Sequence, residues 1–135
     1  MQDAALDLVI SIFAPKNFRE TARVLRPGGC FALVYPRANH LVELRQRYAL
    51  MRHHKDKAER YAGAVSRMIG PPTVVRLVGR TFLDPAGVRD VVLMVPAARH
   101  ITPLALDATT EPMAVTFDVS VLLACKAGSS AGRKR

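Results

Sequence analysis

The sequence predicts an α/β fold, because two short apolar segments flank a helical segment within about thirty residues. Residues 8–13 form a nearly unbroken apolar run rich in β-branched side chains, which is typical of a strand buried on both faces of a parallel sheet. Residues 18–25 carry apolar side chains at helical spacing, and Asn17 can cap the first turn. The Pro-Gly-Gly segment at 27–29 ends this helix, and residues 30–35 form a second apolar strand. This order predicts a βαβ unit with parallel strands and a right-handed crossover.

The remaining apolar segments continue the alternation of helices and strands. They are, in order, a helix from about His40, a helix from about Lys57 to Met68, a strand at 73–83, a helix from Pro85 to about Val95, a connection at 101–112 and a strand at 114–126. Asp84 precedes the third of these helices as a natural N-cap. The last strand has the clearest alternation of apolar and polar side chains.

Length and composition set the class of protein. A chain of 135 residues suits one domain, and its 50% of hydrophobic residues are enough for a core. We expect this domain to span residues 1–127 and to be followed by a disordered basic tail at 128–135. No apolar run reaches the roughly 20 residues that span a bilayer, and no signal peptide is visible. These features predict a cytoplasmic protein with no membrane partner.

The net charge of +9 comes largely from the middle of the chain. Residues 37–67 contain eight basic and three acidic residues. A polyanion such as RNA would be attracted to this basic segment. Four of its residues are candidates for contact with RNA: Arg45, Arg47, Arg52 and Lys55. The alternative is that an arginine-rich composition merely places these side chains on solvated helix faces.

Three motifs resemble those of class I S-adenosylmethionine-dependent methyltransferases. They are Asp3-x-x-x-Asp7-Leu-Val-Ile-Ser-x-Phe-Ala-Pro15, Glu20-x-x-Arg23-Val-Leu-Arg-Pro-Gly-Gly29 and Pro36-x-x-x-His40-Leu-x-Glu-Leu44. The second is common to very many methyltransferases. The first and third, with a later Met94-Val-Pro96 where the family usually has Met-Thr-Pro, resemble the bacterial 23S rRNA guanine-N1 methyltransferases. The resemblance covers nearly all of this chain but only about the second half of the family's protein.

The resemblance implies a partial Rossmann-like sheet of about four strands with flanking helices. The last strand would lie antiparallel between the strand at 30–35 and the strand at 73–83. The N-terminal βαβ half, which grips most of the S-adenosylmethionine cofactor in the family, would be lacking, and no G-x-G-x-G occurs in the sequence. The four cysteines of the family's zinc finger would also lie upstream, so no metal site is expected.

The resemblance also implies roles for individual residues at the carboxyl edge of the sheet. The family's cofactor-contacting histidine occupies the position of His40, which the residue pattern alone would make a capping or surface residue. Candidates for the pocket of the methylated base are Phe13, Ala14, Pro15, Arg37, Met94 and His100. Two of these, Phe13 and Met94, suit ordinary core packing equally well. No catalytic residue is implied.

An incomplete sheet has consequences for partners and for the two cysteines. Residues 7–13, central in the complete family fold, would form an exposed apolar edge strand. We expect the chain either to form a homodimer through this strand or to require a separate chain that carries the missing N-terminal half. Cys30 and Cys125 would lie near each other on adjacent strands, a geometry that suits a disulfide poorly, so buried free thiols are expected.

Two classes of function follow. The first, by resemblance, is an S-adenosylmethionine-dependent methyltransferase, as a fragment or short form, that methylates a guanine N1 in 23S rRNA. Because the glycine-rich cofactor loop is absent, this chain alone is expected to be inactive. The second is a non-catalytic α/β module, derived from such an enzyme, that binds RNA or a protein partner. The substrate depends on the resemblance alone.

Overall fold

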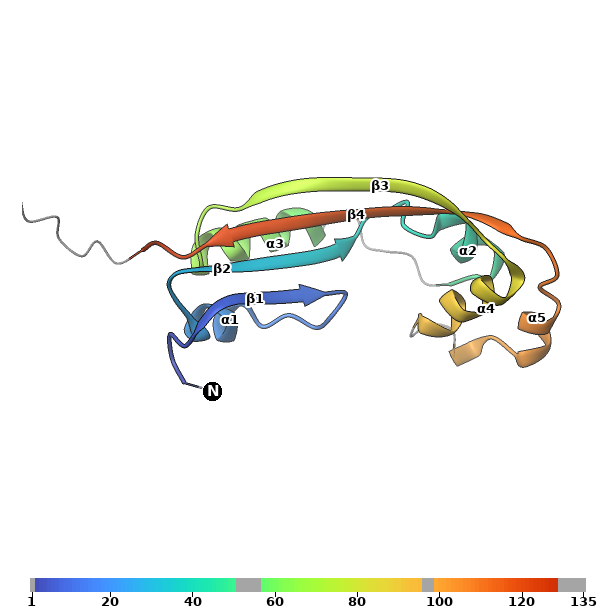
Figure 1. Ribbon diagram of the computed structural model, residues 1–135, viewed down its shortest axis with the longest axis horizontal. Helices are drawn as coiled ribbons and strands as arrows, with labels where there is room; N and C mark the ends of the chain where they lie inside the picture. Colours follow the sequence, from blue (N-terminus) through green and yellow to red (C-terminus); the bar gives the residue numbers. More distant parts are fainter. Residues whose placement is uncertain (1, 51–56, 96–98, 129–135) are drawn as a thin grey trace, which may run out of the picture. The chain divides into compact units, whose positions relative to one another are not determined.

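Four strands form one mixed sheet in the order β1-β2-β4-β3, with helices packed against it (Figure 1). The computed structural model describes residues 2–50, 57–95 and 99–128. The elements are β1 (Leu6–Ile12), α1 (Phe18–Val24), β2 (Leu25–Pro36), α2 (Val42–Arg47), α3 (Lys57–Met68), β3 (Thr73–Leu83), α4 (Pro85–Met94), α5 (Pro103–Asp107) and β4 (Met113–Cys125). The predicted α/β class is confirmed.

The strand order and directions are those that the resemblance implies. β1 and β2 pair in parallel, with Leu8 opposite Cys30, and α1 is the crossover between them. β4 lies between β2 and β3. Figure 1 shows β4 running opposite to β2, and the Arg37 N–H donates to the Asp118 carbonyl oxygen at 2.9 Å where β2 ends beside β4. The last strand of the sequence is therefore inserted antiparallel between two earlier ones.

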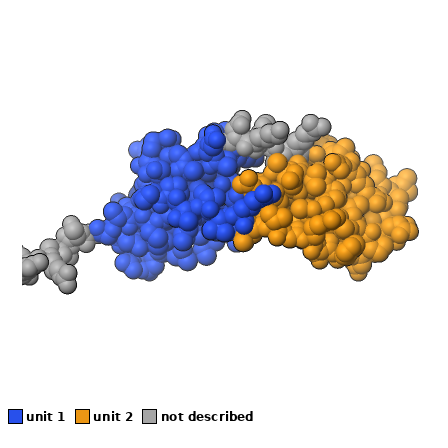
Figure 2. Space-filling model, turned by 90° about the horizontal axis from the view of Figure 1, so that it is seen from above, with its two compact units in different colours: residues 1–35, 55–76, 120–135 blue, residues 36–54, 77–119 orange. Residues whose placement is uncertain are grey.

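The chain divides into two compact units (Figure 2). Unit 1 consists of residues 1–35, 55–76 and 120–135, and unit 2 consists of residues 36–54 and 77–119. Each unit has its own hydrophobic cluster. Apart from Gly128, the predicted basic tail lies outside the described residues.

The core of unit 1 forms where α1 and α3 pack on one face of the sheet. Its buried members come from β2, α3 and β4: Leu25, Phe31, Leu33, Tyr35, Val65, Ile69, Leu122 and Ala124. Phe18 of α1 meets Phe31 and Tyr61 edge to face, with ring centroids 6.2 and 5.8 Å apart. Burial of a large apolar side chain contributes about 1.5–3 kcal/mol, so this cluster supplies much of the stability of unit 1.

Local chemistry fixes both ends of α1. The Asn17 side chain accepts a hydrogen bond from the Glu20 N–H at 3.0 Å, as the sequence predicts. α1 ends at Val24, before the Pro-Gly-Gly segment at 27–29 that was predicted to end it, and β2 already begins at Leu25. Within β2, Gly28 has φ of +78°, which favours glycine. At Gly29 an added Cβ would lie only 2.9 Å from two backbone oxygens, so the close approach to β1 requires glycine.

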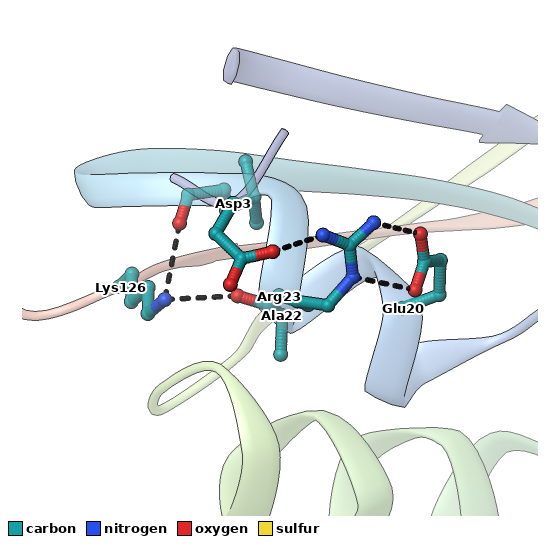
Figure 3. Close-up of polar contacts among 6 residues, drawn as sticks. Asp3, Glu20, Ala22, Arg23 and Lys126 are labelled. Carbon is teal, nitrogen blue, oxygen red and sulfur yellow. Dashed lines mark hydrogen bonds and ion pairs between the residues drawn. The ribbon is translucent and has the colours of Figure 1, made fainter. Parts of the chain in front are cut away.

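Two cations hold the last turn of α1 (Figure 3). The Arg23 guanidinium lies between the carboxylates of Asp3 and Glu20. The Lys126 ammonium, just beyond β4, donates to the carbonyl oxygen of Ala22 at 2.8 Å and to that of Leu25, the C-cap residue of α1, at 3.0 Å. Carbonyls at a helix C-terminus lack partners within the helix, so these bonds satisfy them and join α1 to the end of β4.

Unit 2 has a core of valine and leucine side chains around α4. Asp84 caps α4 as predicted, accepting from the Gly87 N–H at 2.7 Å, and Val88 and Val92 are fully buried. The segment at 101–112 was expected to be a plain connection, but it contains the five-residue α5. Thr102 caps α5 and places Leu106 in the core.

The first helix after β2 begins later than predicted. α2 starts at Val42 rather than at about His40, because Leu41 has φ = 51° and lies in the left-handed region. The Leu41 N–H donates to the Thr116 carbonyl oxygen at 2.7 Å, which ties this turn to β4. The chain therefore makes a turn over residues 37–41 before the helix begins.

β1 is an exposed edge strand. Among the described residues it pairs with β2 alone, and Leu8, Ile10 and Ile12 are 49–59% exposed. Burial on both faces, suggested by the composition of this strand alone, is therefore wrong, whereas the exposed apolar edge implied by the incomplete sheet is confirmed. Asp7 and a register shift between Leu6 and Leu8 protect the start of this edge strand, but Leu8–Ile12 contains neither a charged residue nor proline.

The expectation of free, buried thiols is wrong. Cys30 and Cys125 form a disulfide between β2 and β4, with Cα atoms 4.0 Å apart. Cys125 is exposed and Cys30 half-buried. Directly opposite residues of an antiparallel pair without mutual hydrogen bonds have Cα atoms about 4.5 Å apart, so the register brings the two sulfur atoms within bonding distance.

Reduction of this disulfide should lower the free energy of unfolding by about 2–5 kcal/mol, because the bond joins residues 95 positions apart and restricts the unfolded chain. Urea unfolding with and without reductant measures the effect. The double variant C30S/C125S serves as control and should not respond to reductant. Two titratable thiols in the untreated, denatured protein would contradict the assignment.

Candidate functional site

A cavity of about 540 Å³ lies in unit 1 where β1 ends. Its walls include Ser11, Ala14, Lys16, Thr21 and Phe31. Ligands of open α/β sheets bind at the carboxyl ends of the strands. The volume falls within the range of about 300–1,000 Å³ that is usual for small-molecule sites. This cavity is the candidate binding site of unit 1.

One residue of the cavity wall, Ser11, has a buried hydroxyl for which the described residues supply no hydrogen-bond partner. An unsatisfied buried polar group costs about 1–3 kcal/mol, which a ligand donor or acceptor would offset. The Lys16 ammonium donates to the Ala14 carbonyl oxygen at 2.9 Å and lies 4.9 Å from the centroid of the Tyr61 ring. The cavity wall therefore combines apolar side chains with the hydroxyl residues Ser11 and Thr21 and the cation of Lys16.

Of the three pocket candidates that follow β1, two line the cavity and one does not. Ala14 and Pro15 line the cavity. Phe13 is absent from its walls and is 54% exposed, so the core-packing interpretation of Phe13 is wrong. Its φ of 50° is unusual for a bulky residue and turns the chain away from β2 into the segment 14–17. Sequence analysis missed Ser11 and Lys16, although Ser11 is the only polar residue between Leu8 and Phe13.

His40 lies in unit 2 and is buried, with 8% of its surface exposed. Its Nδ1 accepts a hydrogen bond from the Asp118 N–H at 3.3 Å, and its ring centroid lies 5.8 Å from that of Phe117. The interpretation as a capping or surface residue is wrong, since the N-cap of α2 is Leu41. Burial lowers the pKa of His40, the nearby Arg45 lowers it further, and Asp118 opposes them. The ring is therefore neutral at pH 7, with its proton on Nε2.

Asp118 is the buried acid of this region. It is 1% exposed, and its Oδ1 lies 3.7 Å from the Nε of Arg37, one of the predicted pocket residues. An ionised carboxylate at this depth needs a partner, because desolvation of an unpaired charge is costly. Arg37, His40 and Asp118 therefore form one cluster, although no sequence motif indicated the aspartate.

Two further side chains fix the turn that carries His40. Arg45 donates from Nε to the His40 carbonyl oxygen at 3.0 Å and from Nη2 to the Ala38 carbonyl oxygen. Glu43 accepts from the Thr116 N–H at 2.9 Å and from its hydroxyl at 2.6 Å, which attaches α2 to β4. The position of His40 is thus set from both sides. Contact of Arg45 with RNA stays a prediction.

The remaining candidates are either exposed or outside the described residues. Met94 ends α4 and is 80% exposed, which excludes the core-filling interpretation. His100 is also exposed. Arg47 is exposed on α2, 5.8 Å from the Tyr48 ring centroid. Arg52 and Lys55 lie outside the described residues.

The described residues contain neither a candidate cluster of metal ligands nor a candidate membrane-spanning helix. In the ranges 2–50, 57–95 and 99–128, no group of three or more His, Cys, Asp and Glu side chains is placed to hold a metal ion. No described helix is both long and apolar enough to cross a membrane.

The fold is that of the class I methyltransferases. The YcgJ protein of Bacillus subtilis aligns with a TM-score of 0.55 at 16% identity, over 96% of this chain and 67% of that one. A protein of Bacillus halodurans C-125 assigned as a methyltransferase aligns with a TM-score of 0.53 at 12% identity, over 94% and 67% of the two chains. No family model matches the sequence.

The chain matches the carboxyl-terminal part of the 23S rRNA guanine-N1 methyltransferases, as the motifs predict. It is 37% identical over 123 residues to a Micromonospora griseorubida protein assigned to the 23S rRNA (guanine-N(1)-)-methyltransferases. This match covers 88% of this chain and 42% of the relative. It is 33% identical to the 23S rRNA (guanine(748)-N(1))-methyltransferase of Streptomyces fradiae, over 76% of this chain and 37% of the relative. The chain thus spans only about two fifths of the length of these relatives.

The buried, neutral state of His40 predicts a loss of stability in acid. The pKa of His40 in the folded protein lies below its ordinary value of 6.5, so the unfolded chain binds the proton first as the pH falls. The neutral His40 ring therefore contributes its full share of the folding stability above pH about 6.5. This contribution is lost as the pH falls through the pKa that His40 has in the folded protein. Urea unfolding at several pH values between 8 and 5 measures this change.

Two variants isolate the contribution of His40. His40→Asn keeps an acceptor for the Asp118 N–H but cannot titrate, so its stability should depend less on pH. His100→Asn replaces an exposed histidine and should retain the parent profile. An unchanged pH profile in the His40 variant would show that another group causes the acid loss.

Proposed function

We propose that this chain acts as the carboxyl-terminal part of an S-adenosylmethionine-dependent methyltransferase, as a fragment or short form, that methylates guanine N1 in 23S rRNA. The observation that carries the proposal is the match, over 76–88% of the chain, to two relatives whose names state this activity. The class I methyltransferase fold supports the reaction class. A cytoplasmic location follows from an rRNA substrate.

The cavity after β1 suits a flipped-out guanine. A purine is planar and mostly apolar on its faces, and the walls at Ala14, Pro15 and Phe31 provide apolar contact. The edge of guanine carries both donors and acceptors, and the unpaired Ser11 hydroxyl can bond to either kind. A base that is modified on its Watson–Crick edge must leave its stack and enter such a pocket. Ser11 would therefore orient the base.

The chain's residues do not by themselves form a site for S-adenosylmethionine. His40 is the residue that the resemblance assigns to the cofactor, yet its ring is buried and its Nδ1 already accepts from Asp118. No G-x-G-x-G loop occurs in the sequence. The part of this chain in the reaction is therefore to bind the guanine and to hold it in one orientation, and methyl transfer by the chain alone is not expected.

A non-catalytic module that binds RNA is the second candidate, and the missing G-x-G-x-G loop favours it. Such a module would hold RNA through the basic segment at 37–67 without a preference for one base. Selective recognition of guanine separates the two candidates.

Calorimetry with guanosine and adenosine monophosphates tests the guanine pocket. We expect the chain to prefer the guanine nucleotide, and Ser11→Ala to weaken it about threefold to tenfold, the loss of one hydrogen bond. Ser66→Ala, at an exposed serine of α3, is the matched control and should bind as the parent does. Equal affinity for the two nucleotides, or equal binding by the two variants, would exclude the pocket.

Contact of the basic segment with RNA has a separate test. Arg47→Ala should weaken binding to a 23S rRNA fragment about twofold to threefold at low salt and reduce the slope of log affinity against log salt by about one. Arg19→Ala removes an exposed arginine outside this segment and should have a smaller effect. Fluorescence anisotropy at several salt concentrations gives both quantities, and identical slopes for the two variants would argue against RNA contact at Arg47.

A further inference from the structure

We propose that unit 1 carries a docking surface for the amino-terminal part of a 23S rRNA guanine-N1 methyltransferase, the part that this chain does not match. The surface is the uncovered sheet face formed by Leu8, Ile10, Ile12, Ala32, Val34 and Leu123, together with the open edge of β1. Ile10 and Ile12 of this surface also border the cavity, whereas Leu8 does not, and the proposal does not depend on guanine binding.

The register of the sheet defines this face. Leu8, Ile10 and Ile12 lie opposite Cys30, Ala32 and Val34, so these six side chains share one side of the β1–β2 pair. Phe31 and Leu33 alternate with them and point to the other side, where α1 and α3 pack. The uncovered sheet face therefore has no helix of unit 1 on it among the described residues.

β4 extends the same face. Leu122 and Ala124 are buried in the core under α1 and α3, whereas Leu123 between them is exposed. Alternation along a strand places Leu123 on the opposite side from that core. The disulfide partner Cys125 also lies on this side, since it bonds to Cys30. Apolar side chains thus continue across three neighbouring strands.

Parallel strands require cover on both faces. Sheets with a parallel βαβ crossover occur almost only with helices on each side, because their strands are apolar in both directions. Here one face has its helices and the other has exposed Leu8, Ile10 and Ile12. The strand edge is open as well, so the complement that fits is a further strand beside β1 and a helical layer over the uncovered sheet face.

The relatives identify this complement. This chain matches only 42% of the Micromonospora griseorubida relative, at its carboxyl-terminal part, so the larger share of that relative precedes the match. β1 is the edge strand of the described sheet, so its open side is where the preceding part of the relative would join. A third of each solved class I methyltransferase chain also has no counterpart here.

A second copy of this chain fits less well. Two seven-residue strands would pair along only about 23 Å and would leave the uncovered sheet face of each copy exposed. Copies with a net charge of +9 also repel each other. The homodimer is therefore an outcome of the test and not the proposed assembly.

The test co-expresses the 135-residue chain with the amino-terminal part of the Micromonospora griseorubida relative. Size-exclusion chromatography with light scattering should find a 1:1 complex, and Leu8→Lys should weaken it at least tenfold. The control is Leu77→Lys on β3, at the opposite edge of the sheet. Leu77 is 53% exposed and Leu8 is 49% exposed, so the two changes are comparable. The Leu77 variant should bind as the parent does. Hydrogen exchange of residues 6–12 should slow in the complex. Where the separate part does not fold, one polypeptide that joins it ahead of this chain gives the same exchange measurement.

Three results would overturn the proposal. They are a homodimer of the lone chain that Leu8→Lys dissociates, no change in exchange of β1 in the mixture and in the joined polypeptide, and a complex that Leu8→Lys leaves intact. Leu8 is not part of the cavity wall, so guanine binding by the lone chain should not change in this variant. Failure of docking and failure of the guanine pocket are therefore seen in different measurements.

Discussion

The parallel pairing of β1 with β2 is the constraint on which the rest of unit 1 depends. Parallel neighbours cannot be joined by a tight turn, so the chain must cross one face of the sheet, and α1 is that crossover. The crossover brings Phe18 onto Phe31 and creates the core with α3. It also places the carboxyl ends of both strands at one edge, where the cavity with Ser11 opens.

Unit 2 depends on a different interaction, the burial of Asp118. An antiparallel β4 brings this carboxylate beside the end of β2, and Arg37 approaches it from there. The backbone N–H of the same residue bonds to His40, which fixes the ring in its neutral form. Buried polar groups must be paired, so the turn at 37–41 has little freedom. The histidine is thus held in one orientation before any ligand binds.

Local rules predicted much of this fold, because they act within a few residues. The caps at Asn17 and Asp84 needed only a polar side chain before a helical pattern. The five-residue α5 was missed because it is too short for periodicity, although Thr102 followed by proline is a start signal. The alignment of strands that are distant in the sequence was harder to predict. Neither the disulfide nor the burial of Asp118 follows from the spacing of residues along the chain. Ser11 was overlooked because a single polar residue in an apolar strand usually has an ordinary backbone partner.

The position of the disulfide is related to the uncovered sheet face. A sheet with helices on one side only buries less apolar area than a covered one, and the hydrophobic contribution to its stability is correspondingly smaller. Cys30 and Cys125 lie on the side that lacks helices and link the interior of β2 to the last residue of β4. A cross-link over 95 residues restricts the unfolded chain without needing a second layer. The bond therefore stabilises the register of β2 and β4 at the place where packing from a covering layer is missing.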